Sequence, residues 1–307
     1  MLDLTRLKIF LSTAENLSFS EAAHQLHLSQ PTVSHHIKGL ERDLGVALFD
    51  RSTHKVKLTE AGRLMYPRVK KLIRDTVEIH QMVESTQDKI LGSLRIACST
   101  TTGKYILPQF AARFHERHPG VRIAILRCTS SFVMPQLLEE EANLGVVSFE
   151  ASDGELESQD FFNDHIVLIT PANHPWAKRD AIEPSELIGQ QIIHREPESG
   201  TSRVLAIELA RHDISLEDMD TVLELGNAEA IVTTVAAGHG ISFVSRIAAT
   251  CQLEHGLVSE VSVNDLSLYR KIFMVRKKLH PANRAMEAFW GFVHEPTNRD
   301  LLQIAEA

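Results

Sequence analysis

The stretch SFSEAAHQLHLSQPTVSHHIKGLERDLG, residues 18–45, decides the fold of the N-terminal part of the chain. Ser18 and Ser29 each precede a short run that contains apolar residues, and both are placed to cap the first turn of a helix. Pro31 lies in the first turn of the second helix, where a missing backbone N–H costs little. The apolar residues of that helix recur at spacings of four, three and four residues: Val33, Ile37, Leu40 and Leu44. Two helices joined by a tight turn, with Gly45 ending the second, are therefore expected.

The second of these helices keeps a polar outer side, formed by Gln30, Thr32, Ser34, His35 and Lys38. Hydrogen-bonding side chains near the N-terminal end of such a helix can reach base edges in the major groove of duplex DNA. A plain helical corner in an unrelated protein shows the same spacing. The pattern by itself leaves both interpretations open.

The flanking sequence completes a winged helix-turn-helix. Residues 4–14 carry apolar residues at close to helical spacing. The apolar run 46–49 and the alternating run Lys55-Val56-Lys57-Leu58 flank a polar stretch, which predicts a short two-stranded wing. Basic residues of this wing, together with Arg6 of the first helix, suit contacts to DNA phosphates, which position a protein without reading sequence: Arg51, Lys55 and Lys57. We therefore expect a DNA-binding domain over residues 1–58.

Residues 59–90 predict one long helix, which Thr59 can cap. Its apolar positions alternate steps of three and four residues, a period that suits pairing with a second helix. At 1.5 Å per residue the helix would be about 45 Å long, too long for the small domain alone to bury. We favour a dimer seam, and the alternative is a helix folded onto the chain's own C-terminal domain. The seam positions are Ala61, Met65, Val69, Leu72, Thr76, Ile79, Val83, Thr86 and Ile90.

From Gly92 the sequence alternates strands and helices, which predicts an α/β domain with a parallel sheet over residues 91–307. A second lobe with the same alternation is expected to begin at His165–Ile169, and the chain is expected to return to the first lobe near Tyr269. The first lobe would comprise residues 91–162 and 268–307, and the second residues 163–267. Two lobes joined by two crossings imply a cleft, a common site for small ligands.

Composition and charge limit the possible functions. Apolar residues make up 43% of the 307 residues and the net charge is −8. Residues 1–58 carry seven Lys and Arg against six Asp and Glu, whereas the remainder carries 25 against 34. A protein that coats nucleic acid over its whole surface is excluded, so DNA would be bound by the N-terminal end. Without a secretory signal or an apolar run near the roughly 20 residues that span a bilayer, we expect a cytoplasmic protein with no membrane contact.

The chain resembles the LysR-type transcriptional regulators. The resemblance rests on residues 10–62, FLSTAENLSFSEAAHQLHLSQPTVSHHIKGLERDLGVALFDRSTHKVKLTEAG, which match the winged helix-turn-helix of that family nearly position for position. It continues more weakly through STTTGKYILPQFAARFHERHPGVRI (residues 99–123), REPESGTSR (195–203) and GNAEAIVTTVAAGHGISFVS (226–245). The first block is highly specific, whereas the later blocks indicate an effector domain and not its ligand.

This resemblance implies an N-terminal winged helix-turn-helix, a linker helix and a two-lobed, periplasmic-binding-protein-like effector domain, in a homodimer that often forms a tetramer. Residues carried over as approaching bases are Gln30, Pro31, Ser34 and His35, and those favouring the DNA backbone are Ser29, Thr32, Lys38 and Arg51. Two residues depart from the family pattern. His35 stands where arginine is common, which weakens the charge there at neutral pH, and Asn143 stands where the family usually has an aspartate.

Two hydroxyl-rich segments predict the effector site, Ser99–Gly103 and Glu198–Ser202. Each lies between a strand end and a helix start, where free backbone N–H groups attract anions, so a carboxylate, sulfate or similar oxyanion is favoured. The candidate effector-binding residues are Ser99, Thr100, Thr101, Ser131, Ser199, Gly200 and Thr201. Simple helix capping by these Ser and Thr residues is the alternative. Arg127 and Arg203 are candidate countercharges.

Other chemistry finds little support. Cys98, Cys128 and Cys251 lie far apart and are interpreted as free thiols, with a redox role for Cys98 or Cys251 as the alternative. The histidine pairs, His24 with His27 and His35 with His36, lack a third metal ligand at a suitable spacing, and no nucleophile or phosphate-binding motif occurs. We expect no metal, no cofactor and no enzymatic activity.

The leading hypothesis is a transcription factor that binds double-stranded promoter DNA and responds to a small molecule. A solute-binding protein whose N-terminal domain does not read sequence is the second hypothesis, and an enzyme acting in the interlobe cleft is the third. Equal affinity for scrambled DNA would favour the second, and turnover of a bound ligand would favour the third. The sequence identifies neither the effector nor the target genes.

Overall fold

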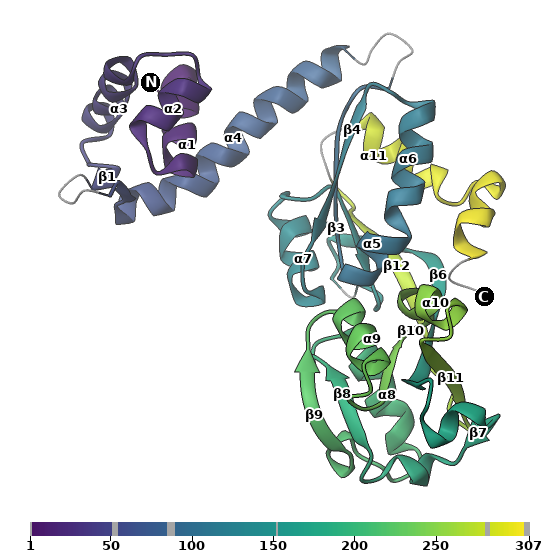
Figure 1. Ribbon diagram of the computed structural model, residues 1–307. Coiled ribbons are helices and arrows are strands. Elements are labelled where there is room, and N and C mark those ends of the chain that lie inside the picture. The colour runs from purple at the N-terminus through teal and green to yellow at the C-terminus, as the bar shows by residue number, and fades with distance from the viewer. Residues whose placement is uncertain (1, 51–54, 85–89, 152, 280–282, 304–307) are drawn as a thin grey trace. The chain divides into compact units, whose positions relative to one another are not determined.

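In the computed structural model the chain forms two compact units, Met1–Thr86 and Gln87–Ala307 (Figure 1). The structure describes residues 2–50, 55–84, 90–151, 153–279 and 283–303. The first unit contains helices α1 (Leu4–Asn16), α2 (Phe19–Gln25), α3 (Gln30–Leu44) and α4 (Glu60–Glu84) and strands β1 (Phe49–Asp50) and β2 (Lys57–Leu58).

Polar caps start the first three helices, as the sequence predicts for two of them. Ser18 Oγ accepts the backbone N–H of Glu21 at 3.2 Å, and Ser29 Oγ accepts that of Thr32 at 3.2 Å. Asp3 caps α1 in the same way, and Gly45 ends α3 with φ of 71°. The inner faces of these helices meet in one core whose most deeply buried members include Phe10, Ala22, Val33, Ile37 and Leu40. The helix-turn-helix is confirmed.

The wing is a short antiparallel ribbon in which Phe49 pairs with Leu58. It is fastened to α3 by the Glu41 carboxylate, which accepts the backbone N–H of Leu48 at 2.8 Å and that of Phe49 at 3.2 Å. These bonds satisfy two backbone donors at the point where the chain leaves the helix domain. Residues 51–54, with the predicted phosphate contact Arg51, lie outside the described residues.

Helix α4 is shorter than the sequence predicts. It begins at Glu60 and ends at Glu84, residues 85–89 lie outside the described part of the chain, and Ile90 is not helical. The expectation of a helix through Ile90 is wrong, because that side chain packs against the core of the second unit. A side chain held in that core cannot also continue a free-standing helix.

The expected seam along α4 has two parts. Ala61, Met65 and Val69 pack against the core of the first unit, so the start of the seam is already covered by the chain itself. Further along, Leu72 and Ile79 are 44% and 59% exposed. This second part offers uncovered apolar surface for another helix.

The second unit is an α/β domain with two lobes. Its strands are β3 (Gly92–Cys98), β4 (Val121–Arg127), β5 (Leu144–Val147), β6 (Leu156–Pro171), β7 (Ala181–Ile182), β8 (Gln191–Arg195), β9 (Asp220–Leu225), β10 (Ser242–Ser245), β11 (Val258–Val263) and β12 (Tyr269–Lys277). Its helices are α5 (Thr100–Tyr105), α6 (Leu107–Arg117), α7 (Ser130–Leu138), α8 (Gly200–Ala210), α9 (Ala228–Ala236), α10 (Arg246–Glu254) and α11 (Arg284–Phe292), with short 3₁₀ segments at Pro175–Lys178, Pro184–Leu187, Leu216–Asp218 and Pro296–Leu302.

Strand β3 runs parallel to both β4 and β5, as expected. The expectation of a wholly parallel sheet is wrong, because β12 is antiparallel to β5 and β6, and β10 and β11 are antiparallel to β6. The main sheet has the order β4-β3-β5-β12-β6-β11-β7, with β10 also paired to β6, and β8 and β9 form a separate parallel pair. Figure 1 shows helices packed on this framework in both lobes.

The two lobes share strand β6, which is 16 residues long. Its first part pairs with β12 from Leu156 to His165, and its second part pairs with β10 from Ile166 to Ile169. We expected the second lobe to start with a new strand at His165. The structure instead continues the strand through His165, because β12 pairs with the residues that precede it. The crossing between the lobes is a continuous, hydrogen-bonded strand.

Each lobe has a core of its own. Phe110, Phe114 and Phe289 are fully buried in the first, and Ile192 and Leu209 are fully buried in the second. Separate cores allow two lobes to hold a cavity between them without exposing either interior. Among the described helices, none has both the length and the apolar character that crossing a bilayer requires.

Candidate functional site

The polar side of α3 lies on the surface of the first unit. Gln30, Pro31, His35 and Lys38 are exposed and Ser34 is half-buried, while the apolar residues of the same helix face the core. This is the placement that the spacing predicts, and it leaves hydrogen-bonding groups free to approach a major groove. Contact of these residues with DNA stays a prediction.

Ser29 and Thr32, two of the residues predicted to contact the DNA backbone, also stabilise the start of α3. The Ser29 and Thr32 hydroxyls lie 2.7 Å apart, in addition to the cap between Ser29 and the Thr32 backbone. Both groups are therefore oriented by the helix itself. On the wing, Lys55 and Lys57 are exposed.

Arg6 is engaged within the domain. Its Nη1 lies 2.5 Å from Asp43 Oδ2, which ties α1 to α3. A Cβ at Gly39 would lie 3.2 Å from Arg6 Cζ, so the glycine lets this guanidinium pack closely against α3. Asp43 thus offsets part of the Arg6 charge, and the phosphate contact suggested for Arg6 stays a prediction.

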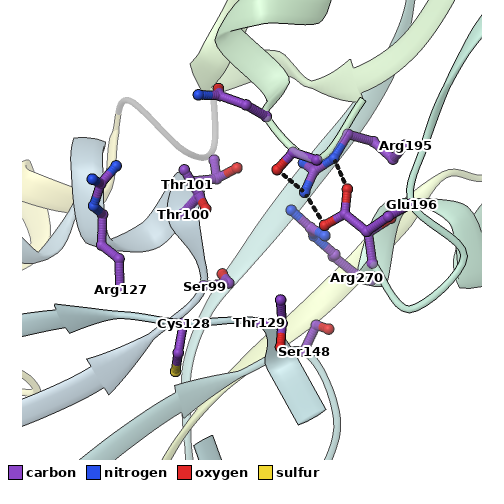
Figure 2. A pocket seen from close by; sticks show the side chains of 14 residues that line it. Ser99, Thr100, Thr101, Arg127, Cys128, Thr129, Ser148, Arg195, Glu196 and Arg270 are labelled. Atoms are coloured by element: carbon purple, nitrogen blue, oxygen red, sulfur yellow. Dashed lines mark hydrogen bonds and ion pairs between the residues drawn. The ribbon is translucent and has the colours of Figure 1, made fainter. Parts of the chain in front are cut away.

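A cavity of about 330 Å³ lies between the lobes of the second unit (Figure 2). The first lobe contributes Ser99, Thr100, Thr101, Arg127, Cys128, Thr129 and Ser148. The second contributes Arg195, Glu196, Ser199, Gly200, Gly226 and Asn227, and Arg270 comes from β12, where the chain has returned to the first lobe. Five of the seven predicted effector residues therefore line one cavity.

Ser131 and Thr201 are not among the lining residues. Ser131 is exposed, and its hydroxyl lies 3.2 Å from that of Thr129, which does line the cavity. Thr201 is buried, and its Oγ1 accepts a hydrogen bond from Arg270 Nη1 at 3.2 Å. Thr201 thus acts through Arg270, while the structure gives Ser131 no place on the cavity wall.

The serines at the starts of α5 and α8 differ in their bonds. Ser199 Oγ accepts the backbone N–H of Ser202 at 3.1 Å and lies 3.0 Å from Ser202 Oγ, so the capping interpretation holds for this residue. Ser99, the equivalent residue of α5, makes no side-chain capping bond in the described structure. Its hydroxyl remains available to a ligand.

Helix α5 is short because it ends at Tyr105, and after Ile106 a separate helix, α6, begins. Pro108 lies in the first turn of α6, where it starts a new helix because it has no N–H to continue the old one. The break sets Thr100 and Thr101 on a separate turn at the cavity.

Gly200 has a steric reason to be glycine. A Cβ at this position would lie 2.3 Å from Ser148 Oγ and 2.8 Å from Arg270 Nη1. The absence of a side chain lets the start of α8 approach both Ser148 and strand β12. This close approach brings the two sides of the cavity together.

Three arginines and one glutamate make the cavity wall positively charged. Figure 2 shows Ser99, Thr100 and Thr101 on one side and Arg195, Glu196 and Arg270 on the other. Arg127 was predicted as a countercharge, whereas Arg195 and Arg270 were missed. The other candidate, Arg203, lies outside the lining, with its guanidinium 5.7 Å from the centre of the Phe149 ring.

An ion pair joins the lobes near the cavity. Lys104 of α5 pairs with Glu229 of α9, and this hydrogen bond raises the pKa of the lysine. Asn227, which caps α9 by accepting the backbone N–H of Glu229 at 2.9 Å, lines the cavity. Both charged side chains are exposed, so this pair contributes little to stability by itself.

Asn143, one of the two departures from the family pattern, has a structural role. Its Oδ1 accepts the backbone N–H of Arg95 at 2.8 Å, and its own N–H donates to the Arg95 carbonyl at 2.8 Å. The side chain thus extends the pairing at the edge of β3. A carboxylate oxygen accepts the same bond, which explains how either residue type serves here.

The cysteines occupy three different environments. Cys98 is buried, and burial raises the pKa of its thiol to about 12. Cys128 lines the cavity, and burial also raises the pKa of this thiol, while Cys251 is exposed. Because the thiolate is the reactive form, Cys98 has little capacity for redox chemistry in the folded protein.

We expect iodoacetamide to modify Cys251 in the native protein and to leave Cys98 intact. At about pH 8 a thiol of pKa about 12 is ionised to roughly one part in ten thousand, and Cys98 is also shielded from reagent. Peptide mass mapping after alkylation, with and without urea, measures both sites. Native modification of Cys98 at the rate of Cys251 would contradict this interpretation.

A winged helix-turn-helix joined to a two-lobed α/β domain with an interlobe cavity is the architecture of a DNA-binding transcriptional regulator. Two family models match the chain: "LysR substrate binding domain" over residues 87–297 and "Bacterial regulatory helix-turn-helix protein, lysR family" over residues 4–63. The chain belongs to the LysR family of transcriptional regulators.

Known proteins agree with this assignment. The uncharacterized HTH-type transcriptional regulator YeiE of Escherichia coli is 32% identical over 96% of this chain and 98% of its own length. The solved structure of full-length CbnR complexed with target DNA is similar with a TM-score of 0.73 at 18% identity, covering 95% of this chain and 99% of that one. The regulatory domain of Synechocystis CcmR in complex with 2-PG is similar with a TM-score of 0.60 at 24% identity, covering 66% of this chain and 95% of that one.

Proposed function

We propose that this LysR-family regulator reads promoter DNA in a sequence-specific way and is controlled by a small anionic effector bound between its lobes. The observation that carries the proposal is the convergence of Arg127, Arg195 and Arg270 on one cavity that hydroxyl groups also line. Arginine matches the planar, two-oxygen face of carboxylate and phosphate groups.

DNA reading is assigned to the exposed side of α3. We propose base contacts by Gln30, Pro31, Ser34 and His35, and backbone contacts by Ser29, Thr32, Lys38, Arg51 and Lys55. The solved complex of CbnR with its target DNA supports this mode of binding for the shared fold. Because His35 lacks the fixed charge of arginine, its contact would depend more on hydrogen bonding than on charge.

Self-association is assigned to the uncovered part of α4. Leu72 and Ile79 offer exposed apolar side chains on a helix, which suits pairing with a second copy in a dimer, and we propose that two dimers assemble into a tetramer. Two DNA-binding domains would then contact half-sites roughly 34 Å apart. This symmetry predicts operator DNA with an imperfect dyad.

The effector is assigned to the cavity by its size and charge. A volume of about 330 Å³ lies at the low end of the range for ligand pockets, which fits a small-molecule effector. Complex formation between CcmR and 2-PG supports a small ligand for this fold. No histidine is among the described lining residues, and we propose binding without turnover in a cytoplasmic regulator.

The test is retardation of the DNA upstream of the protein's own gene. We expect the purified protein to retard this fragment more strongly than a scrambled fragment of equal composition. Its affinity should fall by roughly a thousandfold between about 50 and about 200 mM salt, because phosphate contacts release counterions. A panel of small carboxylates, sulfate and phosphate, compared at constant ionic strength, should contain a compound that alters retardation. Equal retardation of both fragments would contradict the proposed function.

A further inference from the structure

The cavity contains two arginine–carboxylate pairs of different kinds. Arg270 pairs with Asp164 of β6, and Arg195 pairs with its neighbour in sequence, Glu196. Both arginine side chains are 9% exposed, so each guanidinium depends on a nearby anion to offset the loss of water.

The first pair is fixed by the fold. Arg270 Nε donates to Asp164 Oδ2 at 2.6 Å, and Ser245 Oγ donates to the other oxygen of the same carboxylate at 2.6 Å. Asp164 is 1% exposed and belongs to the continuous strand β6. With both oxygens bonded and its backbone in a sheet, this carboxylate cannot leave its arginine without disrupting the crossing between the lobes.

The second pair has no such anchorage. Glu196 follows the last residue of β8 and precedes α8, so it belongs to the loop between them. Its two oxygens accept from Arg195 Nε at 2.9 Å and Nη2 at 2.7 Å, and its side chain is 24% exposed. A rotation of the glutamate side chain would carry the carboxylate to water while Arg195 stays in the cavity wall.

We propose that the Glu196 carboxylate occupies the effector's binding position on the Arg195 guanidinium, and that the effector binds by displacing it. The two donors concerned, Arg195 Nε and Nη2, are called the Arg195 fork. This inference rests on the proposed function and adds to it the group that the effector replaces. Figure 2 shows the glutamate on the guanidinium at the cavity, in the side-on arrangement that a ligand carboxylate takes.

The exchange defines the class of effector. An incoming group must present two oxygens in one plane, so carboxylate, sulfate, sulfonate and phosphate ends qualify and neutral or cationic ends do not. The displaced carboxylate regains water, which offsets part of the desolvation of the ligand. Because Glu196 competes for the same donors, it weakens binding and restricts it to anions that match the fork.

Sulfate titration of the full-length protein tests this exchange. We expect Glu196→Gln to bind sulfate about tenfold more tightly than the wild type, the ratio that corresponds to about 1.4 kcal/mol, because the competing carboxylate is gone. Isothermal titration calorimetry at constant ionic strength, balanced with sodium chloride, measures both affinities. Thermal unfolding of each variant checks that it is folded.

Glu198→Gln is the matched control, because it removes the same charge two residues away at an exposed position outside the cavity lining. Its affinity for sulfate should stay within about twofold of the wild type, since exposed charges are screened by salt. The double variant Arg195→Lys with Glu196→Gln should not show the tenfold gain in sulfate affinity, because lysine lacks the two parallel N–H donors of arginine.

Equal affinities in Glu196→Gln and Glu198→Gln would overturn the exchange, as would a gain that survives in the double variant or an absence of sulfate binding by Glu196→Gln. Promoter retardation does not involve Glu196, so it distinguishes the two ideas. Selective retardation without any effect of Glu196→Gln leaves regulation standing and removes the exchange. A tenfold gain in sulfate affinity without selective retardation supports the exchange and removes the proposed regulation of promoter DNA.

Discussion

Replacing Asp164 by alanine is expected to lower the free energy of unfolding of the effector-binding domain by about 3–5 kcal/mol, the usual cost of removing one partner of a buried ion pair. Asp164 is 1% exposed, and its removal leaves the Arg270 guanidinium without its anion and the Ser245 hydroxyl without its acceptor. The arginine is also part of the cavity wall, so the same change should disorder the effector site.

Urea unfolding followed by tryptophan fluorescence measures this loss, because both tryptophans of the chain, Trp176 and Trp290, belong to the second unit. Asp160→Ala is the matched control on the same strand, where the pair with Lys271 is at least half exposed on both sides. It should cost no more than about 1 kcal/mol. Similar losses in the two variants would show that the Asp164 pair is not a buried element of the crossing.

The N-terminal domain could be predicted from the sequence almost completely, because its determinants are local. Ser29, Pro31, Val33, Ile37 and Gly45 lie within 17 residues and specify where α3 starts, which side faces inward and where it ends. Capping, helical spacing and a C-terminal glycine all act within one helix. The same locality explains why the outward side of α3 was placed correctly.

The cavity was predicted only in part, since its positive charge is assembled from distant segments. Arg270 belongs to β12, and it reaches Thr201 of α8 through the return of the chain between the lobes. Sequence spacing contains no information about such a contact. Arg195 begins the block REPESGTSR, but the countercharge predicted from this block was Arg203, at its other end.

Two errors in secondary structure have physical causes. Ile90 fits the seam of the expected long helix, but the core of the second unit gains more from burying it. Strand β11 (Val258–Val263) was missed although Val258 and Val261 are buried and polar residues separate them. Their three-residue spacing resembles a helix rather than a strand, and only pairing with β6 decides the outcome.

Replacing Gln30 by alanine is expected to weaken binding to the specific promoter by about 1–3 kcal/mol, or roughly 5- to 150-fold, and to leave binding to scrambled DNA unchanged. Gln30 is exposed at the start of α3, where a carboxamide can make two hydrogen bonds to the major-groove edge of one base, and it makes no contribution to the buried core. The loss should therefore appear in specificity and not in stability. Competition retardation with both fragments measures the ratio directly.

Lys38→Ala provides the contrast, because Lys38 is exposed about two turns further along α3 and is expected to touch phosphate. The variant should weaken binding to the promoter fragment and to the scrambled fragment alike. It should also reduce the slope of log affinity against log salt concentration by about 1. Lys8→Ala, an exposed lysine of α1 outside the proposed surface, should change neither quantity. If Gln30→Ala lowered affinity for both fragments equally, α3 would be holding DNA without reading it, and the sequence-specific part of the proposed function would fail.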